Sequence, residues 1–320
     1  MEGKEDKGTA SRALSTTPHA EAVKRTHKEM AWGLAGTLRM LGWLSCVLMC
    51  VRAMWFAFDI RLFSIRQFGP VIHEFDPYFN YRAAEHLAAH GVREFFHWFD
   101  HASWYPLGRP VGTTIYPGPQ LAAVGIWHAL RVFVGDGWSL VEVCCYIPAW
   151  FGVAASAFVG LLAAEASEST VVGVLACYVM AIVPAHASRS VGGGFDNESI
   201  AIAPMCAALN FWCRALRQDR GTDSLSPQLD PARWSCAVAA GVSYAVMAAS
   251  WGGYVFAVNL IAAHAAAEIV LRGWSVVHVP FSLFFLVGTV LAMQVHYARA
   301  PPYPLFLDTF SHNFEDAMRC

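Results

Sequence analysis

Long apolar runs dominate this sequence from about residue 40 onwards. A membrane-spanning helix needs about 20 consecutive, mostly apolar residues. The run at 234–267 is too long for one span and about right for two. The paired glycines of Ser250–Gly253 mark the break inside it, because glycine permits a tight turn. The pattern predicts seven spanning helices, within 40–58, 143–164, 169–188, 200–216, the two halves of 234–267, and 273–298.

A shorter apolar segment, 120–134, is interpreted differently. Pro117 and Pro119 block its start, and His128 and Arg131 interrupt it. We expect an amphipathic helix that lies in the membrane interface instead of crossing the bilayer.

The composition agrees with a polytopic membrane protein. The chain has 320 residues, of which 56% are hydrophobic and only 14% are charged, whereas a soluble domain usually carries about 25% charged residues. These values exclude a disordered protein, a disulfide-stapled secreted module and a basic nucleic-acid binder. The nine cysteines lie mostly in apolar runs and form no CxxC pair, so we interpret them as packing residues.

The distribution of Lys and Arg predicts the orientation. Both the N-terminal segment 1–38, expected to be a disordered tail, and the Arg-rich loop at 214–233 should be cytosolic by the positive-inside rule. The long loop at about 59–141 then lies on the opposite, luminal side. It is rich in aromatic residues, histidine, proline and charge, which is typical of a functional loop. An interfacial helix at 120–134 preserves this sidedness, whereas a further span would reverse it.

Two acidic clusters are expected on this luminal side, at the same depth. Glu74 and Asp76 follow the first span, and Asp196, Asn197 and Glu198 lie between the third and fourth spans. Converging carboxylates favour a hard divalent cation such as Mg²⁺, Mn²⁺ or Ca²⁺. The alternative for each cluster is structural: a turn or a helix cap, with acidic residues in a first helical turn. The glycines at 192–194 are either a flexible hinge or a place where the backbone approaches a ligand closely.

Other candidates have two interpretations each. Arg189 either snorkels to the membrane surface or pairs with an anion. His97 and His101 either share a helix face as zinc ligands or are polar loop residues. Four residues are either interfacial anchors or part of a substrate-binding surface, namely Trp104, Tyr105, Arg109 and Trp251.

These motifs resemble the catalytic subunit of eukaryotic oligosaccharyltransferase, the dolichyl-diphosphooligosaccharide–protein glycosyltransferase, and its protozoan forms most of all. The resemblance covers about residues 39–295, which we expect to be the transmembrane glycosyltransferase domain. The segments that carry it are Arg61–Ser64, His73–Arg82, Trp98–Asp100, Trp104–Arg109, Ile126–Arg131, Ser188–Ala203 and Ser250–Phe256.

The resemblance implies an all-α polytopic membrane fold, the transmembrane domain of a C-type glycosyltransferase. It also implies transfer of a preassembled oligosaccharide from dolichyl diphosphate to the asparagine of an Asn-X-Ser/Thr sequon in a nascent polypeptide. Mg²⁺ or Mn²⁺ would be bound by Asp76, Asp196 and Glu198. Asp76 would also contact the acceptor amide, and Arg189 would match the family's active-site arginine. The implied location is the endoplasmic reticulum membrane, together with other oligosaccharyltransferase subunits.

The sequence departs from the family at its C-terminal end. No Trp-Trp pair is present, although the family's sequon-binding motif is Trp-Trp-Asp, and nothing matches the family's luminal C-terminal domain. Residues 296–320 are proline-dotted and polar, which suggests a frameshifted or truncated end. We therefore expect the chain alone to be inactive. Two alternatives remain open: a non-catalytic transporter or scaffold derived from such an enzyme, and another dolichol-dependent C-type glycosyltransferase.

Overall fold

The computed structural model describes residues 18–217 and 230–299. The chain divides into two units, Met1–Leu48 and Met49–Cys320. Of the described residues, the first unit contains the beginning of helix α1 (Pro18–Arg61), and the second unit contains everything else. The tail at 300–320, and with it most of the atypical segment predicted from the sequence, lies outside the described residues, as do residues 1–17.

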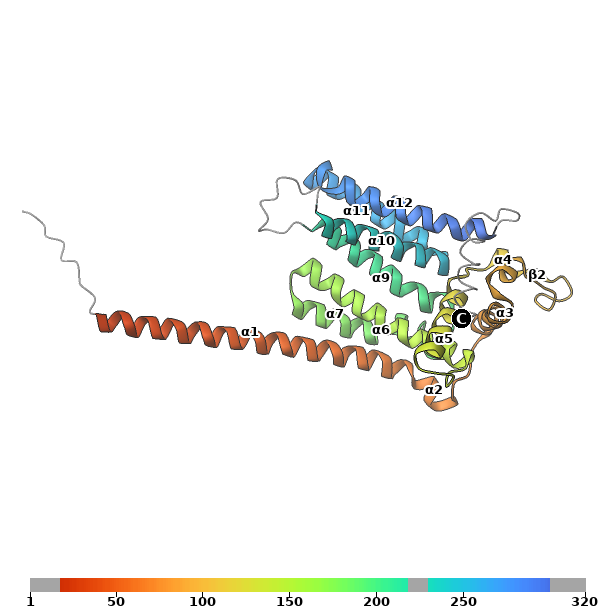
Figure 1. Ribbon diagram of the computed structural model, residues 1–320, viewed down its shortest axis with the longest axis horizontal. Helices are drawn as coiled ribbons and strands as arrows, with labels where there is room; N and C mark the ends of the chain where they lie inside the picture. Colours follow the sequence, from red (N-terminus) through yellow and green to blue (C-terminus); the bar gives the residue numbers. More distant parts are fainter. Residues whose placement is uncertain (1–17, 218–229, 300–320) are drawn as a thin grey trace, which may run out of the picture. The chain divides into compact units, whose positions relative to one another are not determined.

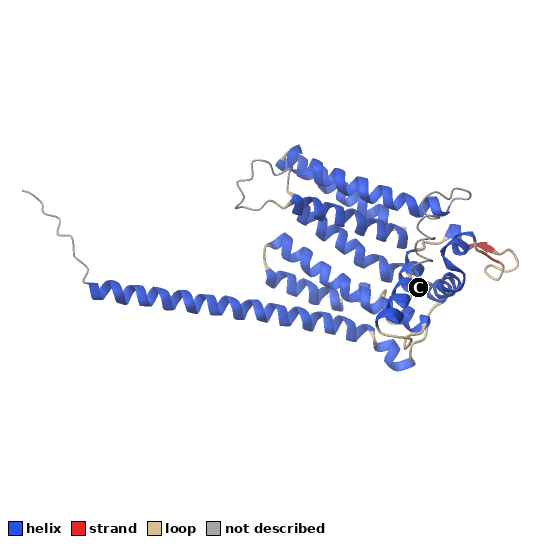
Figure 2. Ribbon diagram, viewed as in Figure 1, coloured by secondary structure: helices blue, strands red, loops and turns tan. Residues whose placement is uncertain are grey.

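Six of the seven predicted spans each fall on one helix, and the third is divided between two helices (Figures 1 and 2). The break predicted at Ser250–Gly253 is confirmed, because one helix ends at Ser250 and the next begins at Tyr254. Five helices of the described part are long and apolar enough to cross a membrane, so the count of seven spans stays a prediction. The seven predicted spans correspond to α1, α6 (Leu140–Ser167), α7 (Thr170–Ile182), α9 (Asn197–Leu216), α10 (Pro231–Ser250), α11 (Tyr254–Arg272) and α12 (Trp274–Arg299). The five that are long and apolar enough lie in α1, α6, α9, α11 and α12.

Two predicted boundaries differ from the structure. The third span, predicted to end at Ser188, ends as α7 at Ile182 and is followed by a separate short helix, α8 (Pro184–Ala187). Pro184 explains the break, because a proline disfavours the helical conformation in the residue before it, and Val183 is extended (φ −58°, ψ 123°). The N-terminal tail, predicted to be disordered to residue 38, is helical from Pro18, where Ala, Glu and Lys supply good helix formers.

The predicted luminal loop, 59–141, is folded. It contains α2 (Phe63–Phe68), α3 (Phe75–His97), a two-stranded sheet of β1 (Phe99–Asp100) and β2 (Arg109–Pro110), α4 (Val111–Thr114) and α5 (Gly118–Phe133). Helix α5 confirms that the segment predicted to be interfacial is helical. The hypothesis that His97 and His101 share a helix face is wrong, because α3 ends at His97 and the chain enters β1.

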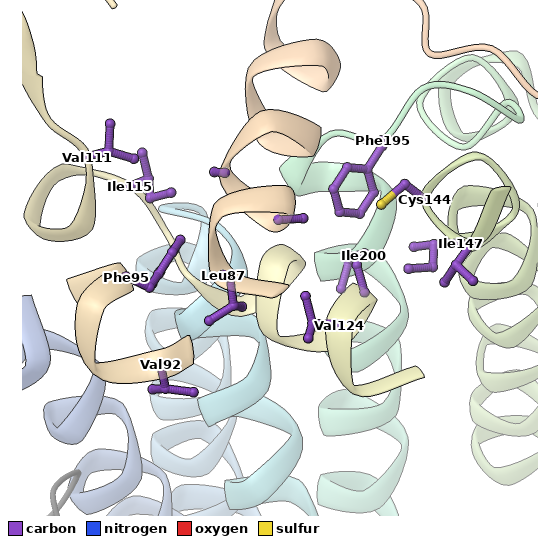
Figure 3. Packing of buried hydrophobic residues seen from close by; sticks show 14 of the residues in the cluster. Leu87, Val92, Phe95, Val111, Ile115, Val124, Cys144, Ile147, Phe195 and Ile200 are labelled. Carbon is purple, nitrogen blue, oxygen red and sulfur yellow. The ribbon is translucent and has the colours of Figure 1, made fainter. Parts of the chain in front are cut away.

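Helix α9 is central to the second unit, and packs against α6 and α10, while α10 packs against α12. Helices α3 and α5 lie at one end of these long helices (Figure 1). An apolar core joins them there, with Leu87 of α3, Val124 of α5, Ile147 of α6, and Phe195 and Ile200 around the start of α9 (Figure 3). This core fixes the first turn of α9 relative to α3.

The β1–β2 hairpin is held by a buried carboxylate. Asp100 is 3% exposed and accepts two hydrogen bonds of 2.9 Å from the Arg82 guanidinium, one of 2.7 Å from Ser103 and one of 3.0 Å from the Ala102 N–H. The Arg82 hydrogen bonds in particular lower the pKa of Asp100 to about 2, against desolvation, which raises it.

This carboxylate should make the hairpin pH-sensitive. Because the folded-state pKa lies below the unfolded value, its stabilisation is present above about pH 4 and lost as the pH falls towards 2. We expect Asp100→Asn to lower the free energy of unfolding at pH 7 by about 1–2 kcal/mol, since Arg82 is partly exposed to water. Thermal unfolding in detergent measures this. The control is Asp136→Asn, whose exposed pair with Arg131 is worth less; equal losses in both variants would contradict the prediction.

Candidate functional site: two acidic motifs at one end of the helices

The first acidic motif opens helix α3. Asp76 lies in its first turn, where the partial positive charge of a helix N-terminus favours a carboxylate. Glu74 is the residue before the helix and has φ 72° and ψ 170°, a backbone conformation that costs a non-glycine residue about 1–3 kcal/mol. Both side chains are exposed.

The second motif opens helix α9. Asp196 is the N-cap: its Oδ1 accepts a hydrogen bond of 2.7 Å from the Asn197 N–H, and its backbone carbonyl accepts one of 2.6 Å from the Ser199 hydroxyl. Glu198 follows in the first turn. The structural interpretation of Asp196 as a helix cap is therefore confirmed, and it leaves the second carboxylate oxygen of Asp196 outside these hydrogen bonds.

Backbone contacts bring the two motifs together. The N–H of His73, three residues before Asp76, donates to the carbonyl of Gly193, three residues before Asp196, at 3.0 Å. The N–H of Gly193 donates to the backbone carbonyl of Cys145 at 3.0 Å. Gly193 has φ +87°, and a Cβ there would lie 2.6 Å from the His73 ring. The glycines thus permit close approach of two protein segments.

A side-chain amide joins the motifs a second time. The Nδ2 atom of Asn80, one turn after Asp76 on α3, lies 3.5 Å from Asp196 Oδ1, 3.2 Å from Asn197 Oδ1 and 3.3 Å from the Phe195 carbonyl. Both motifs therefore occupy the same end of the helices, which the sequence analysis predicted from sidedness alone.

Two arginines lie beside the carboxylates. Arg189 Nε is 3.3 Å from Glu198 Oε2, and the arginine side chain is 59% exposed. Glu198 Oε2 is buried and accepts no hydrogen bond from the part of the chain that the structure describes. Arg109 stacks on Phe79 and Trp104, and burial lowers its pKa while the charge of Asp76 opposes this.

The aromatic candidates are divided between two places. Trp104 and Tyr105 are 67% and 84% exposed in the loop between β1 and β2. Trp251 is the C-cap residue that follows α10, and it packs against Met247 of α10 and Ala201 of α9. An open hollow of about 540 Å³ lies next to the first motif, lined by Glu74, Phe75, Tyr78, Phe79 and Arg82.

Sequence reasoning missed the residues that support this site. Asn80 continues the core-facing stripe of Ala83, Ala84 and Leu87 on α3, and a polar residue in such a stripe is a detectable signal. Gln120 of α5 donates to Asn80 at 3.0 Å. Arg61 is fully buried and donates to Ser190.

The donor atoms suit a hard cation better than a soft one. The carboxylate oxygens that remain, at Asp196 and Glu198, are the ligands that Mg²⁺ and Mn²⁺ prefer. In residues 18–217 and 230–299, however, no group of three or more His, Cys, Asp or Glu residues is gathered closely enough to hold a metal ion. The residues fit a cation chemically, and the complete ligand set stays a prediction.

Comparison with known proteins finds oligosaccharyltransferase relatives. The family model "Oligosaccharyl transferase STT3, N-terminal" matches residues 44–302. The chain is 38% identical over 247 residues to the dolichyl-diphosphooligosaccharide–protein glycosyltransferase subunit STT3 of Dictyostelium discoideum, covering 77% of this chain and 32% of that one. It is 38% identical over 241 residues to the subunit of the same name from Saccharomyces cerevisiae, covering 75% and 32%.

Solved structures show the same fold. The oligosaccharyltransferase AglB from Archaeoglobus fulgidus, in complex with an inhibitory peptide and a dolichol-phosphate, superimposes with a TM-score of 0.61 at 24% identity, covering 82% of this chain and 30% of that one. The Archaeoglobus fulgidus oligosaccharyltransferase in complex with Zn and sulfate gives a TM-score of 0.62 at 25% identity, covering 81% and 32%.

The match to the family model covers most of the chain, whereas the chain spans about a third of the length of the curated relatives. The chain is thus an all-α polytopic membrane protein whose residues 44–302 correspond to the N-terminal portion of those relatives. It belongs to the oligosaccharyl transferase STT3 family.

Proposed function

We propose that this chain supplies the carboxylate side of an oligosaccharyltransferase site. The reaction is transfer of a preassembled oligosaccharide from dolichyl diphosphate to the asparagine of an Asn-X-Ser/Thr sequon. The meeting of the two acidic motifs, through His73 with Gly193 and Asn80 with Asp196, carries this proposal. The names of the relatives, which are dolichyl-diphosphooligosaccharide–protein glycosyltransferases, support the same chemistry.

Asp76, Asp196 and Glu198 are the proposed ligands of Mg²⁺ or Mn²⁺. Asp196 and Glu198 present carboxylate oxygens that the described part of the chain does not use for hydrogen bonds, although Glu198 Oε2 lies 3.3 Å from the Arg189 guanidinium. Asp76 lies in the first turn of the helix that carries Asn80. When bound, such a cation supplies positive charge that stabilises the departing diphosphate.

The chain's own side chains position the two substrates. The carboxylate of Asp76 accepts hydrogen bonds from the side-chain N–H groups of the sequon asparagine. These hydrogen bonds weaken the amide conjugation that makes the nitrogen a poor nucleophile. Arg189, exposed and held beside Glu198, pairs with the anionic diphosphate. Arg109 and its stacked partner Trp104, with Tyr105 and Trp251, belong to the surrounding substrate surface.

The proposed location is the endoplasmic reticulum membrane, with a cytosolic N-terminus and the acidic motifs on the luminal side. The apolar helices support a membrane location, and the Arg-rich loop between α9 and α10 supports the orientation. Other oligosaccharyltransferase subunits are the proposed protein partners.

Binding of Mn²⁺ tests the proposal. The full chain is reconstituted in nanodiscs, and binding is measured from the electron paramagnetic resonance signal of free Mn²⁺. We expect Asp196→Asn and Glu198→Gln each to weaken Mn²⁺ binding at least tenfold, because each variant loses a ligand. Dolichyl diphosphate should tighten the binding of Mn²⁺ to the wild type, since its phosphate oxygens add ligands.

The matched control is Glu85→Gln, which removes an exposed carboxylate from the same helix as Asp76. Its affinity for Mn²⁺ should equal that of the wild type. If Asp196→Asn bound Mn²⁺ as tightly as the wild type, or if dolichyl diphosphate did not change the affinity for Mn²⁺, the non-catalytic scaffold would be favoured instead.

A further inference from the structure

A line of side-chain amides runs from helix α5 to the second acidic motif. Gln120 Nε2 donates to Asn80 Oδ1 at 3.0 Å, and Asn80 Nδ2 faces Asp196 Oδ1, Asn197 Oδ1 and the Phe195 carbonyl. Three segments far apart in the chain are therefore joined by groups that are neither charged nor apolar.

The line is buried in a core that would otherwise be apolar. Gln120 is 0% exposed and Asn80 is 6% exposed. Their helical neighbours Leu87 and Val124 belong to the apolar cluster around Phe195 and Ile200 (Figure 3). Gln120 Oε1 has no hydrogen-bond partner in the described part of the chain. Burying amides here, one of them incompletely satisfied, opposes folding, so stability alone does not explain them.

The chemistry of an amide explains why a neutral side chain, and not a charged one, contacts Asp196. An amide N–H fixes a carboxylate oxygen without neutralising its charge. Asp100 provides the contrast within this chain, because Arg82 neutralises it through two hydrogen bonds and lowers its pKa to about 2. A neutral partner leaves the charge of a carboxylate available to a cation, and Asp196 has such a partner in Asn80, whereas Glu198 lies beside the charged Arg189.

We propose that Asn80 is a positioning residue for Asp196, and that Gln120 acts on Asp196 only through Asn80. Asn80 holds the segment 195–197 through three contacts, of which the one to Asp196 Oδ1, at 3.5 Å, is the longest, and so supports an oxygen that the Asn197 N–H already holds at 2.7 Å. Gln120 fixes the orientation of the Asn80 amide by donating to its side-chain carbonyl. The second oxygen of Asp196 then points in one direction before any ligand arrives. This inference deepens the proposed function and rests on it for the identity of the cation.

Two measurements on the full chain in nanodiscs test the inference. The first is hydrogen–deuterium exchange of the amides at 194–199 without metal, and the second is Mn²⁺ affinity. We expect Asn80→Ala to accelerate the exchange and to weaken Mn²⁺ binding 10–100-fold, as for other partners of metal ligands. Gln120→Met, which conserves volume, should change both in the same direction but less.

The double variant is the decisive case. Because Gln120 acts through Asn80, Asn80→Ala with Gln120→Met should bind Mn²⁺ no more weakly than Asn80→Ala alone. The matched control is Asn210→Ala, which removes an equally buried asparagine amide further along α9, whose two polar side-chain atoms have no hydrogen-bond partner in the described part of the chain. It should change neither measurement.

Several results would overturn the inference. Unchanged exchange and affinity in Asn80→Ala would remove the positioning role, and additive effects in the double variant would remove the dependence of Gln120 on Asn80. An equal effect of Asn210→Ala would show general loosening of the fold. If the wild type bound no Mn²⁺, the proposed metal site would fail, while the exchange measurement would still decide whether Asn80 and Gln120 position Asp196.

Discussion

Gly193→Ala is expected to lower the free energy of unfolding by about 2–5 kcal/mol. Two costs add at this residue. Its φ of +87° is unfavourable for any residue with a Cβ, and a Cβ would collide with the Val71 carbonyl and the His73 ring. The displaced segment contains the carbonyl that accepts from His73, so the two acidic motifs should also separate. Denaturant titration in detergent measures the loss of stability.

Two other glycines separate these costs. Gly135 has φ +105° with open space around it, so Gly135→Ala should show the backbone cost alone, about 1 kcal/mol. Gly125 lies within helix α5, also in open space, and Gly125→Ala should stabilise by about 0.5–1 kcal/mol. A Gly193→Ala loss no larger than that of Gly135→Ala would contradict the proposed collision.

The sequence predicted helices well where apolar runs were long and their ends carried a local signal. Helix α9 begins at Asn197, beside the acidic cluster used to place it, and the α10–α11 break occurs at the paired glycines. Both signals act between near neighbours in the chain. The early start of α1 was missed because charged residues and good helix formers are compatible with either a helix or a disordered tail.

The candidate site was predictable only in its chemistry. The acidic residues were identified from their type and from sidedness, but Asn80 and Asp196 are far apart in the sequence, and no spacing rule relates them. The glycines at 192–194 were interpreted either as a hinge or as a place where the backbone approaches a ligand. The structure shows a close approach, but the group that approaches these glycines is the chain's own backbone. Such long-range pairings depend on packing, which a periodic pattern does not encode.

Arg61→Met is expected to cost about 2–4 kcal/mol and to loosen the segment before the second acidic motif. Arg61 is 0% exposed, and its guanidinium donates to Ser190 Oγ and the Ala57 carbonyl at 2.8 Å, and to the Ala181 carbonyl at 3.0 Å. Its Nη2 lies 2.8 Å from His186 Nδ1. Methionine fills similar space but removes the donor of the Ala181 carbonyl and of Ser190 Oγ, and leaving buried acceptors unpaired costs more than replacing every partner with an apolar group.

The effect of Arg61→Met should extend to the site because the backbone carbonyl of residue 61 accepts a hydrogen bond of 2.8 Å from the Gly192 N–H. Gly192 is next to Gly193, whose carbonyl accepts from His73. Faster hydrogen–deuterium exchange at 190–194 in Arg61→Met would show this directly. Arg61→Lys keeps the charge but has fewer donors, and should lose nearly as much stability, which separates hydrogen bonding from charge. The control is Arg66→Met, whose exposed guanidinium pairs with Asp59 and should cost less than about 1 kcal/mol. Equal effects of Arg61→Met and Arg66→Met would show that the buried network does not hold the segment in place.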